Sequence, residues 1–123
     1  MAEYVIVWNR YDEKIRCVVG HLLYDGGKDL WTFFYDEEGF SLAYQAGFRG
    51  FSDFVDISKI YQSNELFDVF NQRLHRTDNS KRIGHITNGE KLEILGTIGA
   101  SLYTDNIDIN RKRPRVYGKN WYY

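Results

Sequence analysis

The sequence predicts an α+β fold, with a small curved antiparallel sheet or partial barrel and two to four short helices in a single domain. Three observations predict it. The first 35 residues hold three runs of β-branched and aromatic residues, separated by turn-forming residues. Residues 63–74 repeat apolar side chains at helical spacing, and another β-type run covers residues 102–109. A chain of 123 residues with 43% hydrophobic content is long enough for one compact core.

The N-terminal third predicts an antiparallel meander. Residues 4–8 (Tyr-Val-Ile-Val-Trp) read as the first strand, residues 15–24 as the second and residues 30–35 as the third. The turn Asp25-Gly26-Gly27 joins the last two, because glycine accepts the positive φ angles of tight hairpins. Short connections of this kind place consecutive strands side by side.

Two helices and a phenylalanine-rich loop are expected next. Residues 37–45 predict a short helix that Gly47 ends, and the loop at residues 47–56 is expected to plug the core with its rings. A second helix is predicted over residues 63–74, with Ser63 as its N-cap and Glu65 in its first turn. Its apolar stripe is expected in the core, and its outward face holds polar residues: Asp68, Gln72, Arg73 and Arg76.

The remaining elements are a short helix near Ser80, a helix at residues 90–95 and a closing strand at residues 102–109. The one expected boundary lies at Asn110, which divides an α+β domain at residues 1–110 from a tail at residues 111–123. The tail has five basic residues and no acidic ones, against eleven basic and seventeen acidic residues in the domain. A basic tail on an acidic domain can fold back on it or bind an anionic partner.

The residue pattern argues against catalysis. Cys17, the single cysteine, excludes an intramolecular disulfide and is expected to be a buried, inert thiol. We expect no catalytic residues, no metal site and no cofactor, because the histidines and carboxylates lack recognised ligand spacing and no nucleophile motif is present. The absence of a secretory signal pattern and of a long apolar run predicts a cytoplasmic protein without membrane contact.

Three short motifs carry a family resemblance. They are Val19-Gly20-His21-Leu22, the run from Gly47 to Leu74 with its repeated glycine and phenylalanine, and Ile94-Leu95-Gly96-Thr97-Ile98-Gly99 followed by Thr104-Asp105. The pattern resembles the N-terminal subdomain of HipA-like kinases, and more closely the related module that precedes HIRAN domains in bacterial proteins. The sequence departs from the family's pattern in its loop, where Ser52 and Val55 stand in place of prolines, and at Ile98 in place of a glycine.

The resemblance implies a non-catalytic protein-interaction module. In HipA-like proteins this subdomain precedes a kinase core, and no kinase motif is present here. It therefore implies a toxin–antitoxin component that regulates a separate HipA-like kinase or another regulatory protein. The expected partner-binding residues are Asp68, Gln72, Arg73 and Arg76.

Two alternatives remain open from the sequence. One is a single-stranded nucleic-acid-binding module, because clustered cations attract phosphates and aromatic rings stack on bases. Its expected residues all lie in the tail: Arg111, Lys112, Arg113, Arg115, Tyr117 and Trp121. The other is a phage or mobile-element protein whose acidic domain inhibits a host defence factor.

Overall fold

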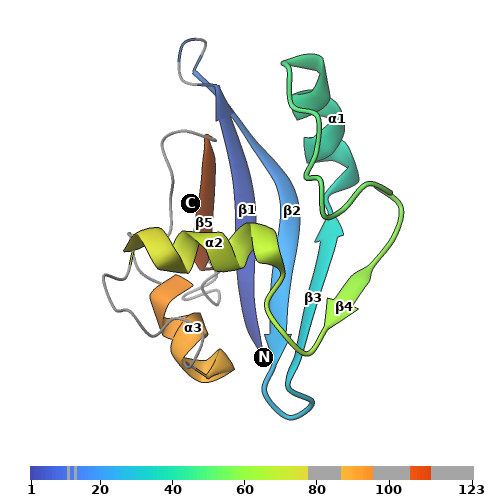
Figure 1. Cartoon of the computed structure of the whole chain (residues 1–123). Helices are drawn as coiled ribbons and strands as arrows, with labels where there is room; N and C mark the ends of the chain where they lie inside the picture. Colours follow the sequence, from blue (N-terminus) through green and yellow to red (C-terminus); the bar gives the residue numbers. More distant parts are fainter. Residues whose placement is uncertain (11, 13, 78–86, 96–105, 112–123) are drawn as a thin grey trace, which may run out of the picture.

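The computed structural model describes residues 1–10, 12, 14–77, 87–95 and 106–111, without the side chains of residues 73–77 and 93–94. These residues form a five-stranded antiparallel sheet and three short helices (Figure 1). The strands are β1 Ala2–Arg10, β2 Ile15–Asp25, β3 Leu30–Tyr35, β4 Tyr61–Ser63 and β5 Ile107–Arg111. The helices are α1 Glu37–Gln45, α2 Asp68–Thr77 and α3 Asn88–Leu95. The predicted α+β fold is confirmed.

The sheet has the order β4-β3-β2-β1-β5, so its described strands do not close into a barrel and β4 and β5 form its two edges. The predicted antiparallel meander is confirmed, because β2 pairs with β1 on one side and with β3 on the other. One irregularity lies between β1 and β2, where Ile6 pairs with Gly20 but Val7 pairs with Val18. Val19 is therefore an extra residue on β2, and such a bulge increases the local twist of a sheet.

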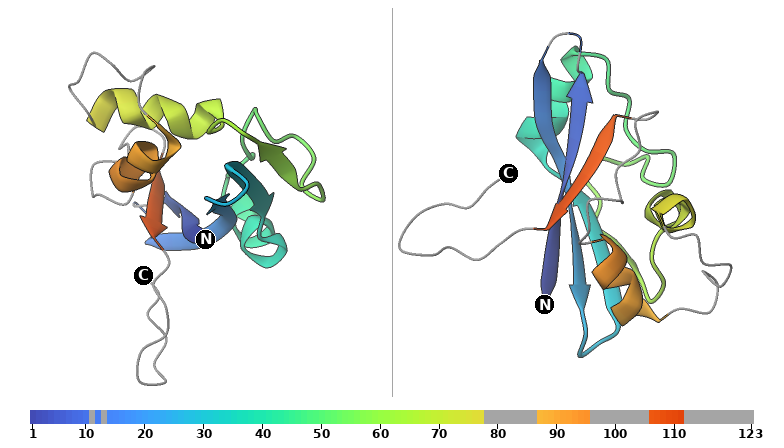
Figure 2. Two further views of the ribbon diagram at one scale, coloured as in Figure 1. Left: turned by 90° about the horizontal axis from the view of Figure 1, so that it is seen from below. Right: turned by 90° about the vertical axis from the view of Figure 1, so that its left-hand side faces the viewer.

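The helices lie at different places on this curved sheet. Figure 2 shows α2 and α3 on one face, inside the curve, and Figure 1 shows α2 crossing the strands. α1 lies apart from them at one end of the sheet, beyond the end of β3 (Figure 1). None of the described helices is long and apolar enough to cross a membrane.

Aromatic rings dominate the core between the sheet and α2. Phe33 of β3 is fully buried and stacks on Phe54, with 4.1 Å between the ring centroids. Phe70 of α2 is fully buried and packs against both rings. Burying a ring of this size contributes about 2 kcal/mol, so this cluster supplies a large part of the domain's marginal stability. The expected plugging of the core by loop rings is confirmed for Phe48 and Phe54, which are 6% and 2% exposed.

The predicted helix over residues 63–74 is wrong at its N-terminus. Ser63 is the last residue of β4 and pairs with Trp31 of β3. Its hydroxyl does accept a hydrogen bond from the amide of Glu65 at 3.1 Å, but within a turn and not at a helix start. Pairing with β3 depends on contacts more than thirty residues away, and here it outweighs the local preference of serine for a cap.

α2 instead begins at Asp68 and receives its cap from another part of the chain. Asp53 Oδ2 accepts a hydrogen bond from the amide of Val69 at 3.0 Å. Leu66 is 4% exposed and so enters the core before the helix starts. The apolar residues that suggested an early helix therefore anchor the connection between β4 and α2.

The other helices agree with the sequence. α1 has the predicted bounds, and Asp36 caps it by accepting a hydrogen bond from the amide of Gly39. α3 begins two residues before the predicted start, because Thr87 and Glu90 form a capping box. The Thr87 amide donates to Glu90 Oε1 at 3.1 Å and the Glu90 amide donates to Thr87 Oγ1 at 3.2 Å.

The last strand is shifted toward the tail. β5 covers residues 107–111, so Arg111, which the sequence assigned to the tail, pairs with Tyr4 of β1. Residues 102–105 of the predicted strand, the predicted helix near Ser80 and the rest of the tail lie outside the described residues.

Candidate functional site

The surface beside α1 is built by a close contact between the helix and β2. An added Cβ at Gly39 would lie 1.5 Å from the Val18 carbonyl oxygen, so only glycine fits there. Ala43, one turn later on the same side, is fully buried. Because this face of α1 presses on the sheet, Leu42 and Tyr44 point outward and are 55% and 52% exposed.

The loop that follows α1 is held by Tyr35 of β3. The Tyr35 hydroxyl donates a hydrogen bond to the Phe54 carbonyl at 2.6 Å and accepts one from the Phe51 amide at 2.9 Å. Burial raises the pKa of Tyr35, so the group stays a neutral phenol that can make both bonds. Loop residues on either side of these rings are thereby fixed in position.

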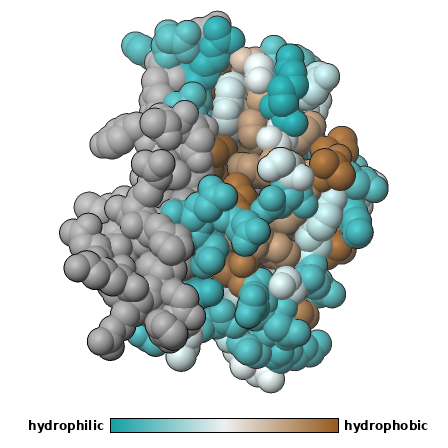
Figure 3. All heavy atoms as spheres, in the orientation of Figure 1, coloured by the Kyte–Doolittle hydropathy of each residue, from teal (hydrophilic) through white to brown (hydrophobic). Residues whose placement is uncertain are grey.

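Fixing the loop leaves apolar side chains on the surface. Val55 is 84% exposed, Ile57 49% and Ile60 62%. We call these three residues, together with Tyr44, the apolar rim. A surface hollow of about 450 Å³ runs between α1 and the loop and is bordered by Tyr35, Phe40, Tyr44 and Ile57. Figure 3 shows apolar atoms at the right-hand margin, on the side of the molecule that carries α1, β4 and the loop.

The turn between the loop and β4 is ordered by Asp56. Its Oδ1 accepts hydrogen bonds from the Ser58 hydroxyl at 2.7 Å and from the Ser58 amide at 3.0 Å. These bonds favour the ionised carboxylate and hold the pKa of Asp56 below its ordinary value. The Tyr61 hydroxyl accepts from the Asp56 amide at 2.9 Å, so the turn is tied to β4.

A second hollow, of about 520 Å³, lies where the β2–β3 hairpin meets the start of α3. Asp29 accepts hydrogen bonds from the Tyr24 hydroxyl and from Asn88 Nδ2, the latter at 2.8 Å. The bond from Tyr24, and then that from Asn88, lowers the pKa of Asp29. Asn88 Nδ2 also donates to the Asn64 carbonyl at 2.9 Å. These polar groups satisfy one another, which indicates a structural joint between hairpin and helix.

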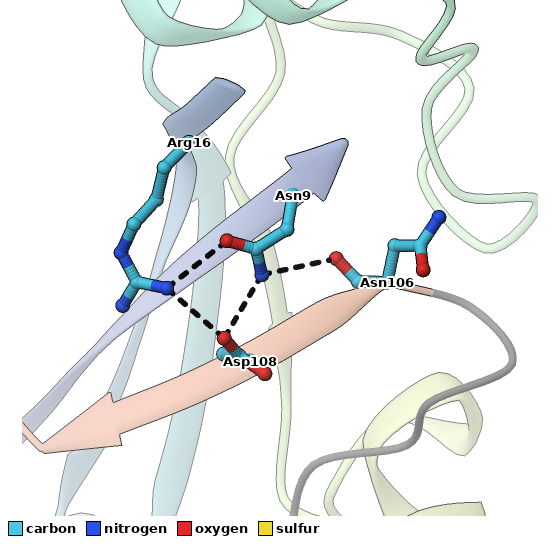
Figure 4. A network of polar contacts seen from close by, with 4 residues as sticks. All are labelled: Asn9, Arg16, Asn106 and Asp108. Carbon is cyan, nitrogen blue, oxygen red and sulfur yellow. Dashed lines mark hydrogen bonds and ion pairs between the residues drawn. The ribbon is translucent and has the colours of Figure 1, made fainter. Parts of the chain in front are cut away.

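A third polar group ties β5 to the sheet. Figure 4 shows Asn9, Arg16 and Asp108 in mutual contact, with Asn9 also reaching Asn106. Asp108 Oδ2 accepts from Asn9 Nδ2 at 2.9 Å and from Arg16 at 3.1 Å. Arg16 donates in turn to Asn9 Oδ1 at 3.0 Å. Asn9 is 2% exposed, so its amide depends on these partners.

His21 on β2 is the histidine whose side chain falls within the described part of the structure. Its Nε2 lies 3.1 Å from Asp36 Oδ2, its Nδ1 lies 3.6 Å from Glu3 Oε2, and its ring stacks on Phe34. No group of three metal-ligating side chains occurs among the residues that the structure describes. Cys17 is buried as expected, and burial raises the pKa of its thiol. His21 and Cys17 both lie on β2, so their side chains pack as part of the sheet.

The predicted binding residues fall in different places. Asp68 and Gln72 lie on α2 with exposed side chains, as predicted. Arg73 and Arg76 are also in α2, but their side chains lie outside the described residues. Arg111 is exposed at the end of β5. The other predicted nucleic-acid-binding residues lie outside the described part of the chain: Lys112, Arg113, Arg115, Tyr117 and Trp121.

The apolar rim was missed by the sequence reading. Its signal was present in residues 55–60, where Val55, Ile57 and Ile60 alternate with polar residues in a segment that matches neither predicted helix nor predicted strand. Apolar residues without a predicted element to bury them are candidates for surface exposure.

Comparisons with protein-family models, with curated proteins and with solved structures find no match to this chain.

Proposed function

We propose that this protein is a non-catalytic interaction module that binds a separate HipA-like kinase through the apolar rim. The observation that carries the proposal is the exposure of four large apolar side chains, Tyr44 on α1 and Val55, Ile57 and Ile60 on the loop that follows it. Exposed apolar patches mark contact sites for other proteins, and Tyr44 and Ile57 of the rim also line the hollow beside α1. The resemblance of the sequence to the HipA N-terminal subdomain supplies the class of partner.

The rim suits a protein partner because its base is rigid. α1 is fixed on β2 through Gly39, and the loop is fixed on Tyr35 through two hydrogen bonds. A pre-ordered surface loses little conformational entropy on binding, and more of the burial energy then appears as affinity. Arg49 lies over the Tyr44 ring, 4.4 Å from its centroid, and adds a cation to the border of the rim.

Calorimetric titration of the full chain against a purified HipA-like kinase tests the proposal. We expect binding with a negative heat-capacity change, because apolar surface is buried. Val55→Asp and Ile57→Asp should each weaken it about tenfold or more, which corresponds to about 1.4 kcal/mol.

The matched control is Lys28→Asp, which changes the charge more than either rim variant but lies in the exposed β2–β3 turn. Its affinity should equal that of the wild type. Absence of binding to the kinase, or equal affinity of the rim variants and the wild type, contradicts the proposal.

A further inference from the structure

Among the described residues, the outer side of β4 is an open sheet edge. β4 stands last in the strand order, so within the described ranges only β3 pairs with it. Unpaired edges present backbone amides and carbonyls that can bind another strand. The direction in which each β4 residue points its backbone groups follows from the register of the sheet.

The register turns the backbone groups of Gln62 outward. The Asp36 amide donates to the Val19 carbonyl at 2.8 Å, which makes these residues a hydrogen-bonded pair next to Gly20 and Tyr35. Hydrogen-bonded pairs alternate along an antiparallel ladder, so Trp31 and Phe33 of β3 turn their backbone groups away from β2 and toward β4. Their partners are Ser63 and Tyr61. Gln62, between them, therefore points its amide and carbonyl away from the sheet.

The two faces of this edge differ in chemistry. Tyr61 and Ser63 border a hollow of about 400 Å³ that is also lined by Asp53, Glu65 and Asp68, and no basic residue lines it among those that the structure describes. Because side chains alternate along a strand, Ile60 and Gln62 face the opposite side, and Ile60 is an exposed member of the apolar rim.

The charge of the edge selects among occupants. Residues 53–68 contain four acidic residues and one lysine. Two copies of this edge would therefore repel each other, whereas a basic strand would be attracted. The unpaired backbone groups of β4 form the binding site, and the acidic side chains favour a positively charged strand in it.

We propose that β4 binds an extended partner segment as a sixth strand, with basic side chains toward Asp53, Glu65 and Asp68 and apolar side chains toward Ile60. Pairing through the backbone supplies affinity in such complexes, and alternate side chains supply specificity. The inference rests on the proposed function, because it names a second contact that the same partner would make beside the apolar rim.

The probe is a fluorescein-labelled peptide, Lys-Val-Lys-Ile-Lys-Val-Lys, titrated into the full chain and followed by fluorescence anisotropy. We expect saturable binding at least tenfold tighter than that of the matched peptide with glutamate in place of lysine. N-methylation of alternate residues removes backbone donors and leaves the side chains unchanged. One alternate set of methyl groups should abolish binding, and the other set should change it less than twofold, since a strand pairs through one side only.

Gln62→Pro provides the protein-side test. Proline removes the outward amide at a position that does not bond to β3, and edge strands tolerate it there. We expect at least tenfold weaker peptide binding with an unchanged circular dichroism spectrum. If this variant fails to fold, Glu65→Lys with Asp68→Lys serves instead, and it should weaken the lysine peptide at least tenfold.

Equal effects of the two N-methyl sets, or equal affinity for the glutamate peptide, would overturn the inference. Dimerisation of the free chain that Gln62→Pro abolishes would also overturn it, because the occupant would then be a second copy. Loss of kinase binding in Val55→Asp without any effect of Gln62→Pro on kinase or peptide would reject strand pairing and leave the proposed function intact.

Discussion

Gly39 is the residue at which α1 touches the sheet, and its lack of a side chain is a packing requirement. We predict that Gly39→Ala lowers the free energy of unfolding by about 3 kcal/mol, because the new methyl group would overlap the Val18 carbonyl. Gly26→Ala is the matched control, since its Cβ would meet nothing closer than 3.8 Å. Urea denaturation of both variants measures the difference. Equal stability of the two variants would show that α1 can move off β2.

The Tyr35 hydroxyl is the residue-scale support of the phenylalanine loop. Tyr35→Phe removes a donor to the Phe54 carbonyl and an acceptor for the Phe51 amide while keeping the ring. We expect a loss of about 2 kcal/mol in the free energy of unfolding, because buried backbone groups lose their partner. The same change at the exposed Tyr44 should cost under about 0.5 kcal/mol. Chemical denaturation followed by tryptophan fluorescence checks both values.

The ionisation of Asp29 makes the free energy of unfolding depend on pH in the acidic range. Its pKa in the folded protein lies below the ordinary value of 3.8, chiefly because Tyr24 donates to the carboxylate. The stabilising contribution of the carboxylate is therefore complete above the pKa of the unfolded chain and is lost as pH falls through the folded pKa. We predict that Asp29→Asn, which tolerates the positive φ of this position, loses less stability than the wild type between about pH 5 and pH 2.

Thermal unfolding at several pH values measures that difference. Asp12→Asn, at an exposed site, is the matched control for the change from carboxylate to amide. An Asp29→Asn curve parallel to that of the wild type would refute the assignment of acid sensitivity to Asp29.

At the scale of elements, α2 depends on a cap from outside its own sequence neighbourhood. We predict that Asp53→Ala lowers the free energy of unfolding by about 1 kcal/mol, because the Val69 amide at the helix start loses its acceptor. Asp53→Asn keeps an acceptor oxygen and should recover most of the loss. Helical circular dichroism combined with urea titration checks this, and equal stability of the alanine and asparagine variants would exclude capping.

The same elements show what sequence can predict and what it cannot. α1 was predicted to the residue, because its cap at Asp36 lies beside it in the chain and Gly47 follows its end. The sequence analysis missed β4 and placed the start of α2 too early in the chain. Ser63 can either cap a helix that follows it or pair in a sheet with Trp31, which lies thirty-two residues away, and in the structure it pairs. Local capping chemistry is visible in sequence, and the competing long-range pairing is not.

The candidate site was less predictable than the fold, for a related reason. The sequence identified Asp68 and Gln72 as exposed, since helical periodicity defines an outward face. It gave no means of separating Phe54, which enters the core, from Val55, which is 84% exposed. The Tyr35 hydroxyl donates a hydrogen bond to the Phe54 carbonyl, and this bond fixes which of the two neighbouring side chains enters the core. When a loop is held in place by a residue far away in the sequence, as Tyr35 holds this loop, no periodic pattern in the sequence shows which loop side chains are exposed.

At the scale of the whole molecule, Asp108 joins the end of the described chain to its beginning. We predict that Asp108→Ala lowers the free energy of unfolding by about 2 kcal/mol, because buried Asn9 and the Arg16 guanidinium lose an ionised acceptor. It should also speed hydrogen exchange in β5 and the neighbouring part of β1 before global unfolding. The control, Asp12→Ala, removes a surface ion pair and should cost under about 1 kcal/mol. Unchanged exchange rates in β5 would contradict the prediction.

The position of β5 beside β1 has a consequence for synthesis on the ribosome. β1 emerges first and can pair with β2 at once, but its other edge is filled only by residues 107–111. At roughly 5–20 residues per second, that edge waits about 5–20 s. During this interval the Val5, Ile6 and Val7 segment has an uncovered strand edge, which is the kind of surface that chaperones bind and that aggregates. The nascent chain is therefore vulnerable at β1, which the completed sheet holds between β2 and β5.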